Sequence, residues 1–175
     1  GCAAFLDARH SLAGPAGSGG VAPVSFQVTA EVFRYIESFT NLERSGSLFG
    51  PRTYRLDRMR ILLEAFGNPQ LAYRTLHVAG TKGKGSTACL CAWALHDSGR
   101  RTGLYTSPHV ESYLERMQVL GTKPDEPLIL QLADRVREAV QGLSADVVER
   151  FGGPNTFELL TLLAFLYFRE TGCTD

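Results

Sequence analysis

The sequence lacks an excess of charge of either sign. Eighteen Lys and Arg residues balance eighteen Asp and Glu residues over 175 positions, so the formal net charge is zero. A polyanionic partner such as DNA or an anionic membrane is usually bound by a basic surplus, which this composition does not supply. We therefore expect no nucleic-acid partner and no membrane partner, and any phosphate chemistry must come from a local site.

Long apolar runs are also missing. No run reaches the length of about 18 residues that a membrane-spanning helix needs. The first 20 residues contain Asp7, Arg9 and His10 where a signal peptide would have a continuous apolar segment. We therefore expect a cytoplasmic location, with a mitochondrial location left open for a eukaryotic source.

Cysteine is scarce, and its spacing fits neither a metal site nor a disulfide framework. The four cysteines are Cys2, Cys89, Cys91 and Cys173. On a helix, Cys89 and Cys91 would lie about 200° apart around the axis and could not share a ligand. We expect all four to be reduced thiols.

The length fits one domain with a sizeable core. Residues 1–24 include a Gly-, Pro- and Ser-rich stretch that cannot bury enough apolar surface to order itself, so we expect a disordered or non-native segment there. Residues 25–175 have an ordinary globular composition. Because the chain begins without Met and stops just after a strongly apolar helical pattern, we interpret it as a fragment.

Apolar residues recur with helical spacing in four segments outside the glycine-rich region. The first begins near Thr29 and the last near Thr156, and each of these threonines is a candidate N-cap. The last pattern is apolar over most of its circumference, which is typical of a core helix. The predicted helices start at Thr29 and cover residues 55–66, 127–141 and 156–171.

The middle of the chain has the pattern of a βαβ unit. Residues 75–79 form a short apolar run typical of a buried strand, and a helix is predicted over 86–97 with Gly99 just past its end. A second strand is predicted over 102–106. Two strands joined by a helix favour a parallel sheet with a right-handed crossover. The fold class we predict is α/β.

Three glycines separate the first predicted strand from its helix, in a segment suited to binding phosphate. Such glycines let successive backbone N–H groups point at an anion beside the positive end of the helix dipole. Lys84 can reach the β- and γ-phosphates of a nucleotide, and the hydroxyl of Ser86 can ligate Mg²⁺. The candidate nucleotide-binding residues are Gly80, Thr81, Lys82, Gly83, Lys84, Gly85, Ser86 and Thr87.

This segment departs from the generic phosphate-loop pattern at two positions. Val78 stands where the leading glycine belongs, and Gly85 separates Lys84 from Ser86. The plain alternative is a glycine turn with an incidental lysine. For Lys82, contact with phosphate and simple solvation both remain open.

The same departures carry a resemblance to a family. The run His77-Val78-Ala79-Gly80-Thr81-Lys82-Gly83-Lys84-Gly85-Ser86-Thr87 resembles the phosphate loop of folylpolyglutamate and dihydrofolate synthases, members of the Mur ligase superfamily. Gly103-Leu104-Tyr105-Thr106-Ser107-Pro108-His109 is similar to a second segment of that family. Glu115-Arg116-Met117 and Asn155–Thr161 resemble two further ones. The resemblance covers residues 33–172 approximately.

The resemblance implies an ATP-binding domain of the Mur ligase type with a parallel sheet, incomplete at its C-terminal end. It also implies an ATP-dependent ligase that joins L-glutamate to dihydropteroate or folate through an acyl phosphate, with ATP and Mg²⁺ as cofactors. Lys84 would be the catalytic residue, and Ser107, with Ser86, would ligate the metal. The residues expected to bind the folate substrate are Thr106, Pro108, His109 and Arg116.

Several parts of such a ligase are expected beyond Asp175, including a Glu-x-Gly-x-Gly-Gly strand and the domain that binds glutamate. We therefore expect the 175 residues alone to be inactive, and a full-length parent to be a monomer. Two rival functions stay open: another amino-acid ligase of the same superfamily, and a non-catalytic nucleotide-binding module.

Two aromatic side chains near the phosphate loop have plain structural interpretations. His77 is expected to be packed inside its strand, and Trp93 is expected to lie in the core. His109 follows a proline in a loop, where a binding role is more usual than catalysis.

Overall fold

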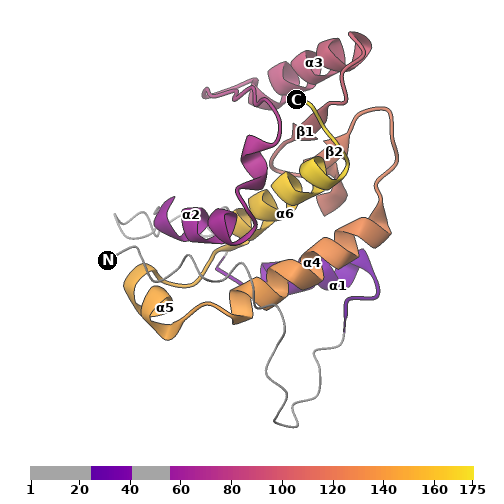
Figure 1. Ribbon diagram of the computed structural model, residues 1–175. Coiled ribbons are helices and arrows are strands. Elements are labelled where there is room, and N and C mark those ends of the chain that lie inside the picture. The colour runs from indigo at the N-terminus through magenta and orange to yellow at the C-terminus, as the bar shows by residue number, and fades with distance from the viewer. Residues whose placement is uncertain (1–24, 41–55) are drawn as a thin grey trace.

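The computed structural model describes residues 25–40 and 56–175 (Figure 1). The predictions for residues 1–24 and for the start of the second helix at residue 55 lie outside these ranges. The elements, in chain order, are α1 (Thr29–Glu37), α2 (Leu56–Ala65), a 3₁₀ helix η1 (Pro69–Leu71), α3 (Lys84–Asp97), β1 (Gly103–Tyr105), a 3₁₀ helix η2 (Tyr113–Arg116), β2 (Met117–Val119), α4 (Glu126–Gln141), α5 (Ala145–Phe151) and α6 (Thr156–Glu170).

Helix α6 is the centre of the molecule, with α1, α2 and α4 packed around it (Figure 1). Its side chains are apolar on nearly every face, so the helix is stable only where other elements cover it on all sides. Leu159, Leu160, Leu162, Leu163 and Leu166 are completely buried there. This confirms the expectation of a core helix over residues 156–171.

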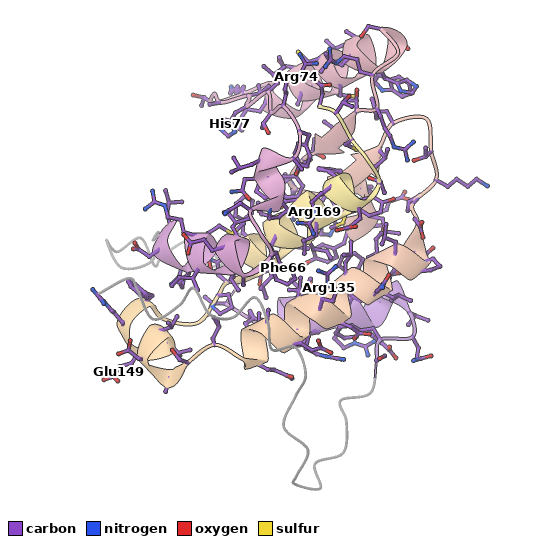
Figure 2. The ribbon with its side chains drawn as sticks, in the orientation of Figure 1. Phe66, Arg74, His77, Arg135, Glu149 and Arg169 are labelled. Carbon is purple, nitrogen blue, oxygen red and sulfur yellow. The ribbon has the colours of Figure 1, made fainter. Side chains whose placement is uncertain are left out.

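Side chains from three elements meet beside the C-terminal half of α6 (Figure 2). Arg169 donates a hydrogen bond from Nη1 to the carbonyl oxygen of Phe66, just beyond α2, at 2.7 Å. The guanidinium carbon of Arg135, on α4, lies 5.6 Å from the centre of the Phe66 ring. These contacts join α2, α4 and α6 at the edge of the core.

The predicted starts of α1, α4 and α6 are correct to within a residue, and α3 begins at Lys84, two residues before its predicted start, but the candidate caps of α1 and α6 are both wrong. The N-cap of α1 is Val28, and that of α6 is Asn155. Asn155 accepts a hydrogen bond from the Glu158 backbone N–H, and Glu158 accepts one from the Asn155 N–H, which is a reciprocal capping box. Thr156 instead donates its hydroxyl to the carbonyl oxygens of Ile36 and Phe39.

The described residues contain one sheet, and it is antiparallel. β1 pairs with β2 in the register Gly103↔Val119, Leu104↔Gln118 and Tyr105↔Met117. This confirms a strand within residues 102–106. It does not confirm the parallel sheet, because β2 runs antiparallel to β1. The chain reaches β2 through the loop that contains η2 and not through a crossover helix.

Residues 75–79 do not form the predicted strand. They have no regular secondary structure, Leu76 is 63% exposed, and within the described part of the chain no strand pairs with them. Because a strand exists only when a neighbour accepts its backbone hydrogen bonds, an apolar run alone does not make one. His77 is accordingly exposed and points outward (Figure 2), contrary to its expected packing.

Helix α3 lies apart from the helical body and packs mainly over β1 (Figure 1). Ala92 is its buried residue and contacts Leu104 and Leu120. Trp93 is 46% exposed and makes an edge contact with His96, so its expected place in the core is wrong. Among the described residues, no helix combines the length and the apolar character needed to cross a bilayer.

Candidate functional site

The turn that leads into α3 depends on the conformation of one glycine. Gly83 is the N-cap residue of α3 and has φ = 74°, in the left-handed region that side chains with a Cβ rarely adopt. The Thr87 N–H donates to the Gly83 carbonyl oxygen at 3.0 Å and starts the helical ladder. Backbone N–H groups of the first turn have no intrahelical acceptor, and the N-cap residue Gly83 has no side chain to bond them.

Lys84 is the first residue of α3, and its side chain folds back over the turn. Its Nζ donates to the carbonyl oxygen of Gly80 at 2.8 Å and to that of Thr81 at 3.4 Å. The ammonium group therefore lies beside the same turn whose N–H groups are free to meet an anion. A cation and unpaired amides at the positive end of a helix dipole can together hold phosphate oxygens.

A groove of about 850 Å³ opens beside this turn. One wall is the extended segment 73–80 with the start of α3, and the opposite wall is β1 and the two residues after it. The structure thus brings Gly80, Lys84 and Gly85 to the same groove as Thr106 and Ser107. The other candidate nucleotide-binding residues do not line the groove: Thr81, Lys82 and Gly83 lie in the turn, and Ser86 and Thr87 lie in the first turn of α3.

Helix α6 forms the floor of the groove with residues that sequence reasoning did not select. Phe157, Phe165 and Phe168 line it, and the hydroxyl groups of Thr161 and Tyr105 lie 3.2 Å apart. Phe157 and Thr161 lie in the segment Asn155–Thr161 that resembles the family, but the resemblance gave them no role. For Phe165 and Phe168 the only sequence signal was the apolar pattern of α6, which does not reveal which face of the helix lines a groove. The floor gives an aromatic surface next to a polar rim, an arrangement common in small-molecule sites.

Asp175 lines the same groove, where two arginines neutralise it. Its carboxylate accepts a hydrogen bond from Arg100 Nε at 2.6 Å and lies 3.2 Å from Arg74 Nε. Its backbone carbonyl accepts from the Gly103 N–H at 2.8 Å, and the Thr174 carbonyl accepts from the Arg74 N–H at 3.1 Å. Residues 174–175 therefore link the two walls of the groove.

The loop after β1 places His109 and Arg116 together, outside the lining of the groove. Arg116 Nε donates to His109 Nδ1 at 2.9 Å. Pro108 follows a cis peptide bond with Ser107. The predicted substrate-binding residues thus form two groups, with Thr106 at the groove and His109 and Arg116 in the adjacent loop.

The carboxylate of Glu115 holds this loop closed. It accepts the backbone N–H groups of Val110, Glu111 and Ser112, at 2.8, 2.8 and 2.6 Å. These bonds, that from Val110 foremost, lower the pKa of Glu115 below its ordinary value because they stabilise the charged form.

Metal ligands are few in this part of the molecule. Across residues 25–40 and 56–175, no three His, Cys, Asp or Glu side chains cluster in a way that could hold a metal ion. Ser86 and Ser107 offer hydroxyl oxygens only, whereas Mg²⁺ usually takes one or two carboxylates together with phosphate oxygens and waters. The described residues therefore do not form a magnesium site by themselves.

The helix-rich body with its small sheet, and the glycine turn and lysine that share one groove with a second loop, define a class: part of an α/β domain with a candidate small-molecule site. Comparison with known proteins agrees with that class. It is a homologue of folylpolyglutamate and dihydrofolate synthases over part of their length.

Two curated relatives show this at the level of sequence. A dihydrofolate synthase/folylpolyglutamate synthase of Bacillus subtilis is 37% identical over 115 residues, which are 66% of this chain and 26% of the relative. A folylpolyglutamate synthase of Lacticaseibacillus casei is 35% identical over 142 residues, 80% of this chain and 30% of the relative. The chain thus spans less than a third of either relative. No protein-family model matches it.

Solved structures give the same result. The folylpolyglutamate synthetase of Lactobacillus casei superposes with a TM-score of 0.71 at 33% identity, over 85% of this chain and 35% of that one. A complex of such a synthase with AMPPCP and folate gives a TM-score of 0.67 at 32% identity, over 85% and 34% of the two chains. The fold is therefore a helix-rich part of the fold of these synthases.

Proposed function

We propose that this chain is the nucleotide-phosphate-binding part of an ATP-dependent ligase that adds L-glutamate to dihydropteroate, to tetrahydrofolate, or to both. The observation that carries the proposal is the shared groove, where Lys84 and Gly85 of the glycine turn face Thr106 and Ser107. Those two segments are the ones that resemble the synthases. The solved relative with bound AMPPCP and folate supports ligands of these two kinds.

In this proposal the turn Gly80–Thr87 holds the ATP phosphates. Unpaired N–H groups at the start of α3 would donate to phosphate oxygens, and Gly83 permits the backbone conformation that aims them. Lys84 would leave the carbonyls of Gly80 and Thr81 and balance the charge on the transferred phosphate. Charge balance and alignment are the main requirements of phosphoryl transfer to a carboxylate, which yields the acyl phosphate that an amine then attacks.

The substrate would lie across the groove from the phosphates. Thr106 and Pro108 would contact it at the end of β1, and the loop with His109 and Arg116 would close over one side. Mg²⁺ would reduce the negative charge between the phosphates, with Ser86 and Ser107 supplying hydroxyl oxygens. Because these hydroxyls are too few for a complete site, we infer that a carboxylate from outside the described residues is required.

The same shortage of ligands underlies the expected behaviour of the isolated chain. We propose that the 175 residues bind nucleotide without forming an amide bond, and that the complete protein acts in the cytoplasm as a monomer on small-molecule substrates. An assay with dihydropteroate, L-glutamate, ATP and Mg²⁺ tests the first statement. Glutamate incorporation above the no-enzyme rate would contradict it.

Nucleotide binding can be tested on the chain by calorimetric titration with AMPPCP. Replacing Lys84 with Ala removes charge-assisted hydrogen bonds worth about 1.5–3 kcal/mol, so affinity should fall by roughly 10- to 150-fold. Lys123→Ala is the matched control, because Lys123 is an exposed lysine outside the groove. Equal affinity in the two variants would show that Lys84 does not hold phosphate.

A further inference from the structure

The hydrogen bond between Arg116 and His109 also indicates which nitrogen of the His109 ring carries the proton. Arg116 Nε lies 2.9 Å from His109 Nδ1. A guanidinium group is a donor only and stays protonated in proteins, so Nδ1 must present a lone pair to it. A neutral imidazole has one N–H and one acceptor nitrogen, and its single proton is then on Nε2.

The His109 ring packs against an aromatic stack. Its centre lies 4.0 Å from that of the Tyr113 ring, which stacks on Phe33 with centroids 4.8 Å apart. The hydroxyl of Tyr113 donates to Glu37 Oε1 at 2.6 Å, so α1 anchors this stack. The guanidinium carbon of Arg116 lies 5.3 Å from the centre of the same Tyr113 ring.

Burial makes Arg116 a firm partner for His109. Arg116 is 3% exposed, whereas His109 is half-buried and keeps an accessible side. The backbone between them is tied by Glu115, which accepts the N–H groups of Val110, Glu111 and Ser112. The aromatic stack and the closed backbone keep the ring beside Arg116, and the hydrogen bond from Arg116 selects Nδ1 as the nitrogen that faces it.

We propose that Arg116 is a positioning residue that holds His109 in the tautomer with its proton on Nε2, so that His109 offers an N–H donor to an oxygen acceptor on the substrate. The identity of that substrate rests on the proposed function. With Nδ1 engaged by Arg116 and Nε2 already protonated, His109 has no free lone pair and is not a general base. Arg116 then acts on the substrate through His109.

Nitrogen-15 NMR of the ligand-free chain tests the tautomer directly, because long-range correlations from the ring protons distinguish protonated from unprotonated ring nitrogens. The chain has four histidines, and His109→Asn identifies the signals of His109 by their loss. The expected spectrum shows Nε2 protonated and Nδ1 unprotonated. A proton on Nδ1, alone or in addition to Nε2, would overturn the proposal.

Two arginine variants separate positioning from a general effect of charge. In Arg116→Met the His109 signals should move to the averaged values of exchanging tautomers, whereas Arg135→Met should leave them as in wild type. Arg135 is a matched control because its guanidinium also lies over an aromatic ring, 5.6 Å from the centre of Phe66. Unchanged signals in Arg116→Met would refute the positioning role. If that variant does not fold, the wild-type spectrum still decides the tautomer.

Folate, added to the same labelled sample, tests the donor role. The Nε2 signal of His109 should shift while the tautomer stays the same. If folate moves backbone signals of the groove and leaves His109 unchanged, the donor role is refuted. If folate moves no signal at all, the proposed folate site is wrong and the donor role fails with it, whereas the tautomer assignment stands on the ligand-free spectra.

Discussion

Glu115 shows how one carboxylate can define a loop that has no regular strand or long helix. Three successive backbone N–H groups donate to its two carboxylate oxygens. The Ser112 hydroxyl oxygen accepts a further hydrogen bond from the Leu114 N–H. The resemblance singled out the segment Glu115-Arg116-Met117 but gave no reason for the glutamate. The reason is local: the carboxylate satisfies backbone donors that would otherwise need water.

The lowered pKa of Glu115 predicts how this loop responds to acid. Because its pKa in the folded chain is below that in the unfolded chain, its stabilising effect is complete above the unfolded value. That effect is lost as pH falls through the folded value. Amide hydrogen exchange at Val110, Glu111 and Ser112, corrected for intrinsic rates, should therefore accelerate as the carboxylate is protonated.

Glu115→Gln is the matching variant, since it keeps the size of the side chain and loses the titrating group. Its exchange at these three amides should be fast at neutral pH and, after the same correction, should change little on acidification. Protection that follows pH equally in both proteins would assign the effect to another group.

At the scale of elements, the helices follow from the sequence far better than the sheet does. Amphipathic spacing within a helix is a local property, so residues 127–141 were predicted almost to the observed bounds of α4. The helix α5, which begins after Ser144, was not predicted because it buries no residue and has only its cap as a signal. Residues 75–79 needed a partner strand, which no local pattern can supply.

The join between α2 and α6 is a buried ion pair that the sequence did not reveal. Arg58 donates to Glu158 from Nε and Nη2, the latter at 3.0 Å, and from Nη1 to the Phe151 carbonyl oxygen at 2.9 Å. Both side chains are about nine-tenths buried. No local pattern indicated this pairing, because Arg58 lies 100 residues before Glu158 in the chain.

Removing one member of this pair should lower the free energy of unfolding by much more than the intact pair contributes to it. Arg58→Met leaves a buried carboxylate without its cation, so the free energy of unfolding should fall by about 3–5 kcal/mol in urea titrations. The double variant Arg58→Met, Glu158→Gln should regain part of the loss, because the introduced amide carries no charge and can still cap α6. Glu170→Gln, at the more exposed Arg169–Glu170 pair, is the control and should change stability by about 0–1 kcal/mol. Equal losses at the two pairs would contradict this account.

Over the whole molecule, one helix organises the fold while the candidate site lies to one side of it. The core gathers around α6, and α3 with its glycine turn touches the rest mainly through β1. The sequence predicted the turn, its lysine and the second loop, because each is a contiguous motif. It could not predict that the aromatic side chains of α6 line the groove between them, since that depends on packing between segments far apart in the chain.

This arrangement predicts that the stability of the molecule depends on the core around α6 far more than on the exposed face of α3. Leu160→Ala empties a fully buried position on α6 and should lower the free energy of unfolding by about 2–5 kcal/mol. Leu90→Ala, on a 72% exposed position of α3, should change it by no more than about 0.5 kcal/mol. The unfolding of each variant should be followed by circular dichroism and by tryptophan fluorescence, and the two variants should be compared. A larger loss at Leu90 than at Leu160 would contradict the central place of α6.

The carbonyl groups of the glycine turn compete with an arriving anion for the ammonium group of Lys84. Lys84 already has two carbonyl acceptors in the free chain, so an arriving anion gains only the difference between its own bonds and those it displaces. A weakly charged anion gains little from that exchange, whereas a polyphosphate exceeds it through several charge-assisted bonds at once. In the proposed function, the turn would therefore favour a polyphosphate over anions of low charge.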